Sequence, residues 1–154
     1  MEFFGAARQA RRDDKELGKG IWRRTHDRFQ RGLDRYHQVL EGIADDALYG
    51  ELVVIANELS AQLPQVRGCC ARAQKLHPSD GLDIPGGSLA GVHRCLSKAG
   101  NSLAAAAQAA AMLRLDPGHA DVPSSGSASV VNVRRRADIV IEDVADAQRY
   151  LETR

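Results

Sequence analysis

Between residues 22 and 43 the chain carries a large, mostly apolar side chain at alternating intervals of four and three positions. The seven residues of this row are Trp22, His26, Phe29, Leu33, Tyr36, Leu40 and Ile43. A seven-residue repeat keeps all of them on one face of an α-helix, whereas the side chains of a β-strand repeat every two residues. The row therefore predicts a long helix that packs along its whole length.

Two later segments repeat this spacing. Residues 47–76 form the first, and Pro64 inside it predicts a kink or a break because proline removes a backbone hydrogen bond. Residues 89–115 form the second, which follows a loop rich in proline and glycine. Asp45 or Asp46 is expected to cap the first of these segments by accepting hydrogen bonds from its free backbone amides.

Three long helices joined by short or moderate connections predict an all-α fold, an antiparallel bundle of three long helices with a short C-terminal helix. We expect the bundle to occupy residues 1–115, with a basic amphipathic extension over 1–20, a linker over 116–137 and the C-terminal helix over 138–152. The stretch SVVNV before the last helix has the composition of a short strand. The sequence leaves open whether the last helix packs on the bundle.

Charges nearly balance over the whole chain, with 21 lysines and arginines, 20 aspartates and glutamates, and a net charge of +1. This balance argues against a protein that binds nucleic acid through bulk charge. The N-terminus lacks an apolar run of the length that a signal peptide or a membrane span needs, and the three cysteines are an odd number. We therefore expect a cytoplasmic protein with reduced thiols.

Uncharged residues fill the stretch from Ala99 to Leu113, where alanines cover every face of the predicted helix. Small side chains let neighbouring helices approach closely, and two interpretations follow. Either the helix is central and covered by the chain's own helices, or one face stays open and pairs with another copy or a partner helix. The second interpretation predicts a homo-oligomer whose interface contains Leu103, Ala106, Ala107, Ala110 and Leu113.

Cysteine and histidine side chains are expected to gather at one level of the bundle if each long helix folds back on the one before it. That level contains Cys69, Cys70, Cys95, His93 and His26. Both residue types bind zinc, and four of them can complete a tetrahedral site. Two alternatives remain open. In the first, Cys70 is a small core residue while Cys69 and Cys95 lie on the flanks of their helices, and in the second, Cys70 and Cys95 form a disulfide or a redox switch.

Basic residues recur at helical spacing in two rows near the N-terminus. The first row is Arg8, Arg12, Lys15 and Lys19, after Phe3 and Phe4, and the second row is Arg24, Arg28, Arg31 and Arg35. Acidic residues are interleaved with them, which is typical of a solvated helix with charge pairs four residues apart. A basic helix with an aromatic tip also fits contact with a partner protein or an anionic membrane, and less well contact with the phosphates of nucleic acid. The residues expected to make this contact are Phe3, Phe4, Arg8 and Arg12.

The sequence shows no Ser-His-Asp arrangement, no paired carboxylate motif and no phosphate-binding loop that follows a strand. We therefore expect a non-enzymatic adaptor or scaffold protein that self-associates through its alanine-rich helix and uses no cofactor. The alternative is a sensor that binds a metal or a small ligand, with zinc at the cysteine and histidine level. Peripheral attachment to a membrane is a third hypothesis, nucleic acid is not an expected partner, and the sequence identifies no particular protein partner.

Overall fold

The computed structural model describes residues 2–115 and 130–153, and within these ranges all regular secondary structure is α-helical. This confirms the predicted fold class. None of the described helices is long and apolar enough to cross a membrane. The helices are α1 (Glu2–Leu17), α2 (Ile21–Glu41), α3 (Asp46–Ser60), α4 (Gln62–Leu76), α5 (Ser88–Leu115) and α6 (Val130–Glu152).

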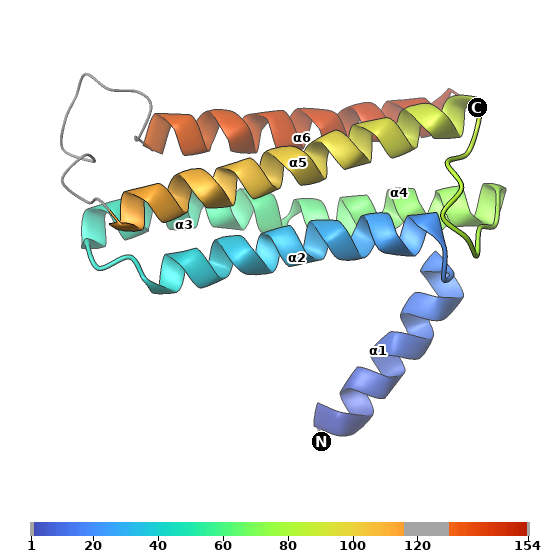
Figure 1. Ribbon diagram of the computed structural model, residues 1–154, viewed down its shortest axis with the longest axis horizontal. Helices are drawn as coiled ribbons and strands as arrows, with labels where there is room; N and C mark the ends of the chain where they lie inside the picture. The colour runs from blue at the N-terminus through green and yellow to red at the C-terminus, as the bar shows by residue number, and fades with distance from the viewer. Residues whose placement is uncertain (1, 116–129, 154) are drawn as a thin grey trace.

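Four rods of helix form the body of the molecule, because α4 continues in the direction of α3 (Figure 1). Around the bundle the rods follow one another in the order α2, α5, α6 and α3–α4, and the last of them closes the ring against α2. Consecutive rods alternate in direction, as predicted. As a result α2 and α5 are neighbours that run parallel, and so are α6 and the α3–α4 rod.

The connection between α4 and α5 spans residues 77–87 and crosses the end of the bundle diagonally. The expectation that α5 folds back along α4 is therefore wrong. α5 lies beside α2, where the Trp22 ring contacts the ring of His93 and Arg28 donates a hydrogen bond to Asn101. The two residues of each pair are 71 and 73 positions apart in sequence. This separation stays nearly constant along two helices that run parallel, whereas it would change steadily along antiparallel ones.

The break in the second long helix occurs next to Pro64, as predicted. α3 ends at Ser60 and α4 begins at Gln62, which places the proline in the first turn of α4. The first amides of a helix have no acceptor within it, so a residue without an N–H costs little there. At the other end of α3, the Asp45 carboxylate accepts a hydrogen bond of 2.8 Å from the backbone N–H of Leu48, which confirms one of the two predicted caps.

The C-terminal helix is longer than predicted and forms the fourth rod of the bundle. It begins at Val130, so residues 130–137 belong to the helix rather than to a linker or a strand, while 116–129 lie outside the described residues. The reason is an apolar row that repeats every three or four positions from the first turn onward. Its buried members are Val133, Ala137, Val140, Val144, Ala147 and Leu151.

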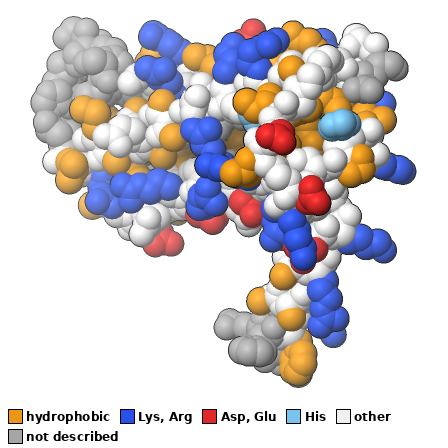
Figure 2. All heavy atoms as spheres, turned by 45° about the vertical axis from the view of Figure 1, so that its right-hand side comes forward, with side chains coloured by type: hydrophobic (Ala, Val, Ile, Leu, Met, Phe, Trp, Pro, Cys, Tyr) orange, Lys and Arg blue, Asp and Glu red, His pale blue; other side chains and the backbone are white. Residues whose placement is uncertain are grey.

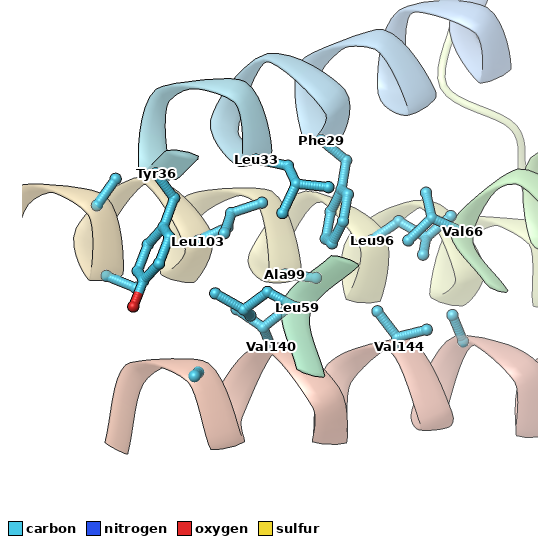
Figure 3. Packing of buried hydrophobic residues seen from close by; sticks show 14 of the residues in the cluster. Phe29, Leu33, Tyr36, Leu59, Val66, Leu96, Ala99, Leu103, Val140 and Val144 are labelled. Carbon is cyan, nitrogen blue, oxygen red and sulfur yellow. The ribbon is translucent and has the colours of Figure 1, made fainter. Parts of the chain in front are cut away.

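Apolar side chains from all four rods meet in one core (Figure 3). Phe29 and Leu33 on α2 point toward Leu96 and Leu103 on α5, and Val140 points into the same core from α6. Removal of this apolar surface from water is the main force that holds the rods together.

The alanine-rich stretch of α5 lies inside this core, because α2 packs along one side of α5 and α6 along another. The side chains of the predicted interface are only 0–2% exposed and contact the chain's own helices. The structure therefore agrees with the first interpretation, in which the helix is central, and it places the five residues predicted for an open face inside the bundle. The five buried residues are Leu103, Ala106, Ala107, Ala110 and Leu113.

α1 stands away from the bundle and meets it only near its C-terminal end (Figure 1). Leu17 is fully buried at the base of α1, whereas residues 4–12 are exposed. Gly18 then turns the chain with a positive φ of 71°, a conformation that glycine adopts without steric cost, and α2 begins at Ile21. The bend that separates α1 from the bundle is therefore set by Gly18.

A cluster of ion pairs, here called the α1 clamp, holds the base of α1 against α2 and α4. Arg67 on α4 lies 2.7 Å from Asp13 and 2.9 Å from Glu16, and Arg23 on α2 lies 2.9 Å from Asp14. Figure 2 shows acidic and basic side chains gathered where α1 joins the body. Burial on its own would raise the pKa of Asp13, but the hydrogen bonds and positive charges around this carboxylate outweigh burial and lower the pKa. Its contribution to stability is thus present above its unfolded pKa and is lost as the pH falls through the folded value.

Replacing Arg67 by alanine is expected to loosen α1 while the bundle stays folded, because the substitution removes two ion pairs of the α1 clamp. Amide hydrogen exchange, measured by mass spectrometry at neutral pH, should become about tenfold faster in residues 13–17, the factor that a loss of roughly 1.4 kcal/mol produces. Arg72→Ala, at an exposed position of α4, is the matched control and should leave exchange unchanged. Unchanged exchange in Arg67→Ala would show instead that burial of Leu17 is enough to hold the helix.

Candidate functional site

One flank of α2 carries four arginines that lie beside α5. Their spacing of four, three and four residues keeps them in one row, over a rise of about 16 Å along the helix. None of them forms an ion pair with a described carboxylate. Two of them donate hydrogen bonds to neutral side chains, Arg28 to Asn101 and Arg35 to Gln38 at 3.4 Å. The residues of this arginine row are Arg24, Arg28, Arg31 and Arg35.

The acidic residues of α2 lie on the adjoining flank, farther from α5. The helical period of about 3.6 residues per turn places Asp27 and Asp34 there. Asp27 is already engaged by Arg23, at 3.0 Å. Like charges one turn apart destabilise a helix by about 0.2–0.5 kcal/mol per pair. No described carboxylate forms an ion pair with the arginine row to offset this repulsion, and an anionic ligand would reduce it.

The wall opposite the arginine row is α5, which is uncharged and made of small residues at this place. Gly100, Ala104 and Ala107 line the α5 side, and Gly32 lines the α2 side. A Cβ atom on Gly32 would lie 3.1 Å from two carbons of Leu103, so the absence of a side chain lets the two helices approach closely. The result is a groove in which the arginine row forms the basic wall on α2. Small, uncharged residues form the opposite wall on α5 and the floor between them.

Two hollows make up this α2–α5 groove, with volumes of about 230 Å³ and 440 Å³. Both are lined by Arg28 and Gly100, so they adjoin, and the hydrogen bond from Arg28 to Asn101 belongs to this junction. Ser97 and Gln108 add a neutral hydrogen-bonding group to each hollow. Because the arginine row extends over about three helical turns, the groove suits an elongated ligand.

Apolar side chains form one end of the groove, next to the α4–α5 connection. Leu82 and Ile84 of that connection line the smaller hollow and remain 58% and 66% exposed. His93 lines the same hollow, and its ring meets Trp22 edge-on with the ring centroids 6.1 Å apart. Burial lowers the pKa of His93, which favours the neutral imidazole at pH 7. Trp22 is the only tryptophan of the chain, so its fluorescence can report on this end of the groove.

The structure does not bring the predicted cysteine and histidine level together. Cys70 lies against the backbone of His26 between α4 and α2, while Cys69 lines a hollow between α4 and α6. Cys95 lines another hollow between α5 and α6, and His93 faces the α2–α5 groove. Among the described residues, no three histidine, cysteine, aspartate or glutamate side chains are grouped so that they could hold a metal ion. The diagonal α4–α5 connection is the reason, because it moves α5 away from α4.

All three cysteines are buried free thiols, so the disulfide considered between Cys70 and Cys95 is not formed. Burial raises the pKa of Cys69 to about 11 and also raises the pKa of Cys70 and of Cys95. Metal ligation and nucleophilic attack both need the thiolate. Cys70 is therefore the small core residue that one alternative predicted, and Cys69 and Cys95, which that alternative placed on the flanks, are buried as well.

The residues predicted to contact a partner or a lipid surface are not part of the groove. Phe4, Arg8 and Arg12 are exposed on α1. The side chain of Phe3 lies outside the described part of the chain. This predicted contact surface is thus separate from the arginine row, although the sequence places the two rows of basic residues next to each other.

No protein-family model, curated protein or solved structure matches this chain. Its function is therefore inferred from the geometry of the groove. The described residues that line the groove include four arginines, several small residues and an apolar end, and no carboxylate. Such a surface can bind an elongated ligand that is anionic on one side and apolar on another.

Proposed function

We propose that this protein is a non-enzymatic adaptor that binds an acidic amphipathic helix of a partner protein in the α2–α5 groove. The observation that carries the proposal is the arginine row, which has no ion-pair partner among the described carboxylates and lies beside a floor of small residues. Binding of a helix in a groove uses an apolar face for affinity and matched charges at the rim for orientation. The groove offers both.

The geometry of a bound helix follows from its period. Its side chains three and four positions apart share one face, so glutamates on that face can follow the arginine row turn by turn. The planar guanidinium groups of arginine suit carboxylates because they offer paired N–H donors. Alanines on the adjoining face would pack over Gly100 and Ala104, and a larger apolar side chain would contact Leu82 and Ile84.

Self-association through the alanines of α5 is not part of this proposal. The residues predicted for that interface are buried, and the one of them that lines the groove, Ala107, is only 2% exposed. Whether the protein forms a homo-oligomer at all stays a prediction. The alternative of a metal sensor gains no support from the structure, because the candidate ligands are dispersed over different helix pairs.

The proposal is tested by a binding titration with a defined peptide. The probe is a fluorescein-labelled helical peptide with glutamate along one face and alanine and leucine along the other, and a second probe carries glutamine in place of glutamate. We expect the protein to bind the acidic probe, more weakly as the salt concentration rises. The double variant Arg24→Gln, Arg31→Gln should bind it about tenfold more weakly, because two charged contacts at the rim are lost.

The double variant Arg8→Gln, Arg11→Gln is the matched control, since it removes the same two charges from an exposed helix face outside the groove. It should bind the acidic probe with unchanged affinity, and circular dichroism should show the same helix content in both variants. Equal affinity for the two probes, or an equal loss in both double variants, would refute the groove as the binding site. Either result would leave only a general attraction between a basic surface and an acidic peptide.

A further inference from the structure

The first half of α1 contacts no other described element. Residues 4–12 are exposed, Phe4 is 69% exposed, and Figure 2 shows this helix clear of the body of the molecule. A short helix without packing partners is only marginally stable in water. A surface that contacts α1 would therefore stabilise it, and the charges of the helix indicate which kind of surface.

The α1 clamp neutralises the acidic residues near the base of this helix. Their three carboxylates are paired with Arg23 and Arg67 of the bundle. In contrast, Arg8, Arg11 and Lys15 form no ion pair with a described carboxylate. The outward part of α1 is therefore basic, although its sequence mixes both signs of charge.

One stripe of α1 combines these unpaired bases with an aromatic ring. Intervals of four, three and four residues place its members within about 60° of one another around the helix. Leu17 and most of the clamp carboxylates lie on the other half of the helix, toward the bundle, so the stripe faces away from the body. Arg12 lies off the stripe and pairs with Glu16 at 3.0 Å. The residues of the α1 stripe are Phe4, Arg8, Arg11 and Lys15.

We propose that the α1 stripe binds the anionic headgroups of a lipid surface. Arginine and lysine reach headgroup phosphates with their charged ends while their apolar stems lie along the helix. An aromatic ring at the helix tip fits the boundary between headgroups and acyl chains. A groove in a partner protein would need a larger apolar face, and the other exposed apolar positions of α1 carry only small side chains, Ala6, Ala7 and Ala10.

Flotation of the full-length protein with lipid vesicles tests this proposal. We expect binding to phosphatidylcholine vesicles that contain about 30 mol % phosphatidylglycerol, and no binding to phosphatidylcholine alone. The double variant Arg8→Gln, Arg11→Gln should lower the partition constant about thirtyfold. This is the factor expected when two basic residues no longer contact an anionic surface. Phe4→Ala should lower it as well, because the ring no longer enters the interface.

The matched control is the groove variant Arg24→Gln, Arg31→Gln, which carries the same net charge and should bind the vesicles like the unchanged protein. Undiminished binding by Arg8→Gln, Arg11→Gln, an equal loss in both double variants, or no binding to the anionic vesicles would overturn the proposal. A further result would also overturn it: the unchanged protein self-associates without vesicles, and Arg8→Gln, Arg11→Gln abolishes this self-association. The stripe would then bind a second copy of the chain rather than lipid. The two double variants have opposite roles in the vesicle and peptide assays, so either proposal can fail while the other stands.

Discussion

Replacing Ala106 by glutamate is expected to destabilise the bundle rather than to separate a dimer. Ala106 is fully buried on α5, the helix that packs between α2 and α6. A carboxylate at this position would be surrounded by apolar side chains without a partner. The expected loss in the free energy of unfolding is about 4 kcal/mol, which lowers the midpoint of thermal unfolding by roughly 10–15 °C in a chain of this size. Thermal unfolding followed by circular dichroism measures this effect.

Ala104→Glu is the matched control for this substitution. Ala104 lies on the exposed face of α5 and lines the groove beside the arginine row, so a carboxylate there stays hydrated and close to basic side chains. It should leave the midpoint unchanged or raise it slightly. The molar mass of both variants in solution completes the test. A folded Ala106→Glu protein that had only lost a second copy would mean that this face of α5 is open and that the burial described above is wrong.

The positions of the helices could largely be predicted because the features that set them are local. The apolar row from Trp22 to Ile43 defines α2, Asp45 supplies the cap of α3, and Pro64 interrupts the rod that follows. Each of these signals depends on residues within one or two helical turns. Such signals are readable from a single sequence because hydrogen bonding within a helix is itself local.

The neighbours of each helix could not be predicted in the same way. An apolar row shows that a face is buried and does not show which helix covers it. The connection over residues 77–87 decides this, and it reaches the diagonal corner of the bundle. The predicted grouping of Cys70 with Cys95 assumed the shorter path, in which α5 lies along α4. The part of the predicted metal site that lies on α5 depended on that assumption about long-range packing.

α6 begins before its predicted start for a different reason. Val130, Val131 and Val133 are β-branched, and such residues have lower helix propensity and higher strand propensity than most others. In the structure, burial of Val133 and Ala137 against the core outweighs this local preference. The apolar row of α6 starts at Val130, and this row is the sequence signal that places the start of the helix there.

The arginine row was visible in the sequence, but the groove beside it was not. Acidic residues interleaved with the arginines predict ion pairs four residues apart. Asp27 forms such a pair with Arg23, which lies outside the row, and forms none with Arg31. The parallel contact between α2 and α5 then places small residues next to the row. Leu82 and Ile84 belong to a loop, so no helical spacing marks them as part of a site. Two large aliphatic residues in a stretch rich in proline and glycine were the available signal.

Val140→Asp tests whether α6 is an integral part of the fold. Val140 is fully buried and points into the core from α6 (Figure 3). An aspartate there should lower the free energy of unfolding by about 3–4 kcal/mol and the thermal midpoint by roughly 10 °C. Val131→Asp, at a position of the same helix that is 60% exposed, is the matched control and should change stability by less than about 0.5 kcal/mol.

The same variant decides which surfaces are open to partners. If α6 unfolds together with α2 and α5, Val140→Asp should lower the single midpoint of the whole bundle and speed amide exchange in all of these helices. The side of α5 beneath α6 would then be covered for as long as the protein is folded, and partners would be left with the groove and α1. If exchange instead sped up only in residues 130–152 at an unchanged midpoint, α6 would be a detachable arm. Its release would expose the alanine-rich face, and a second copy could bind α5 after all.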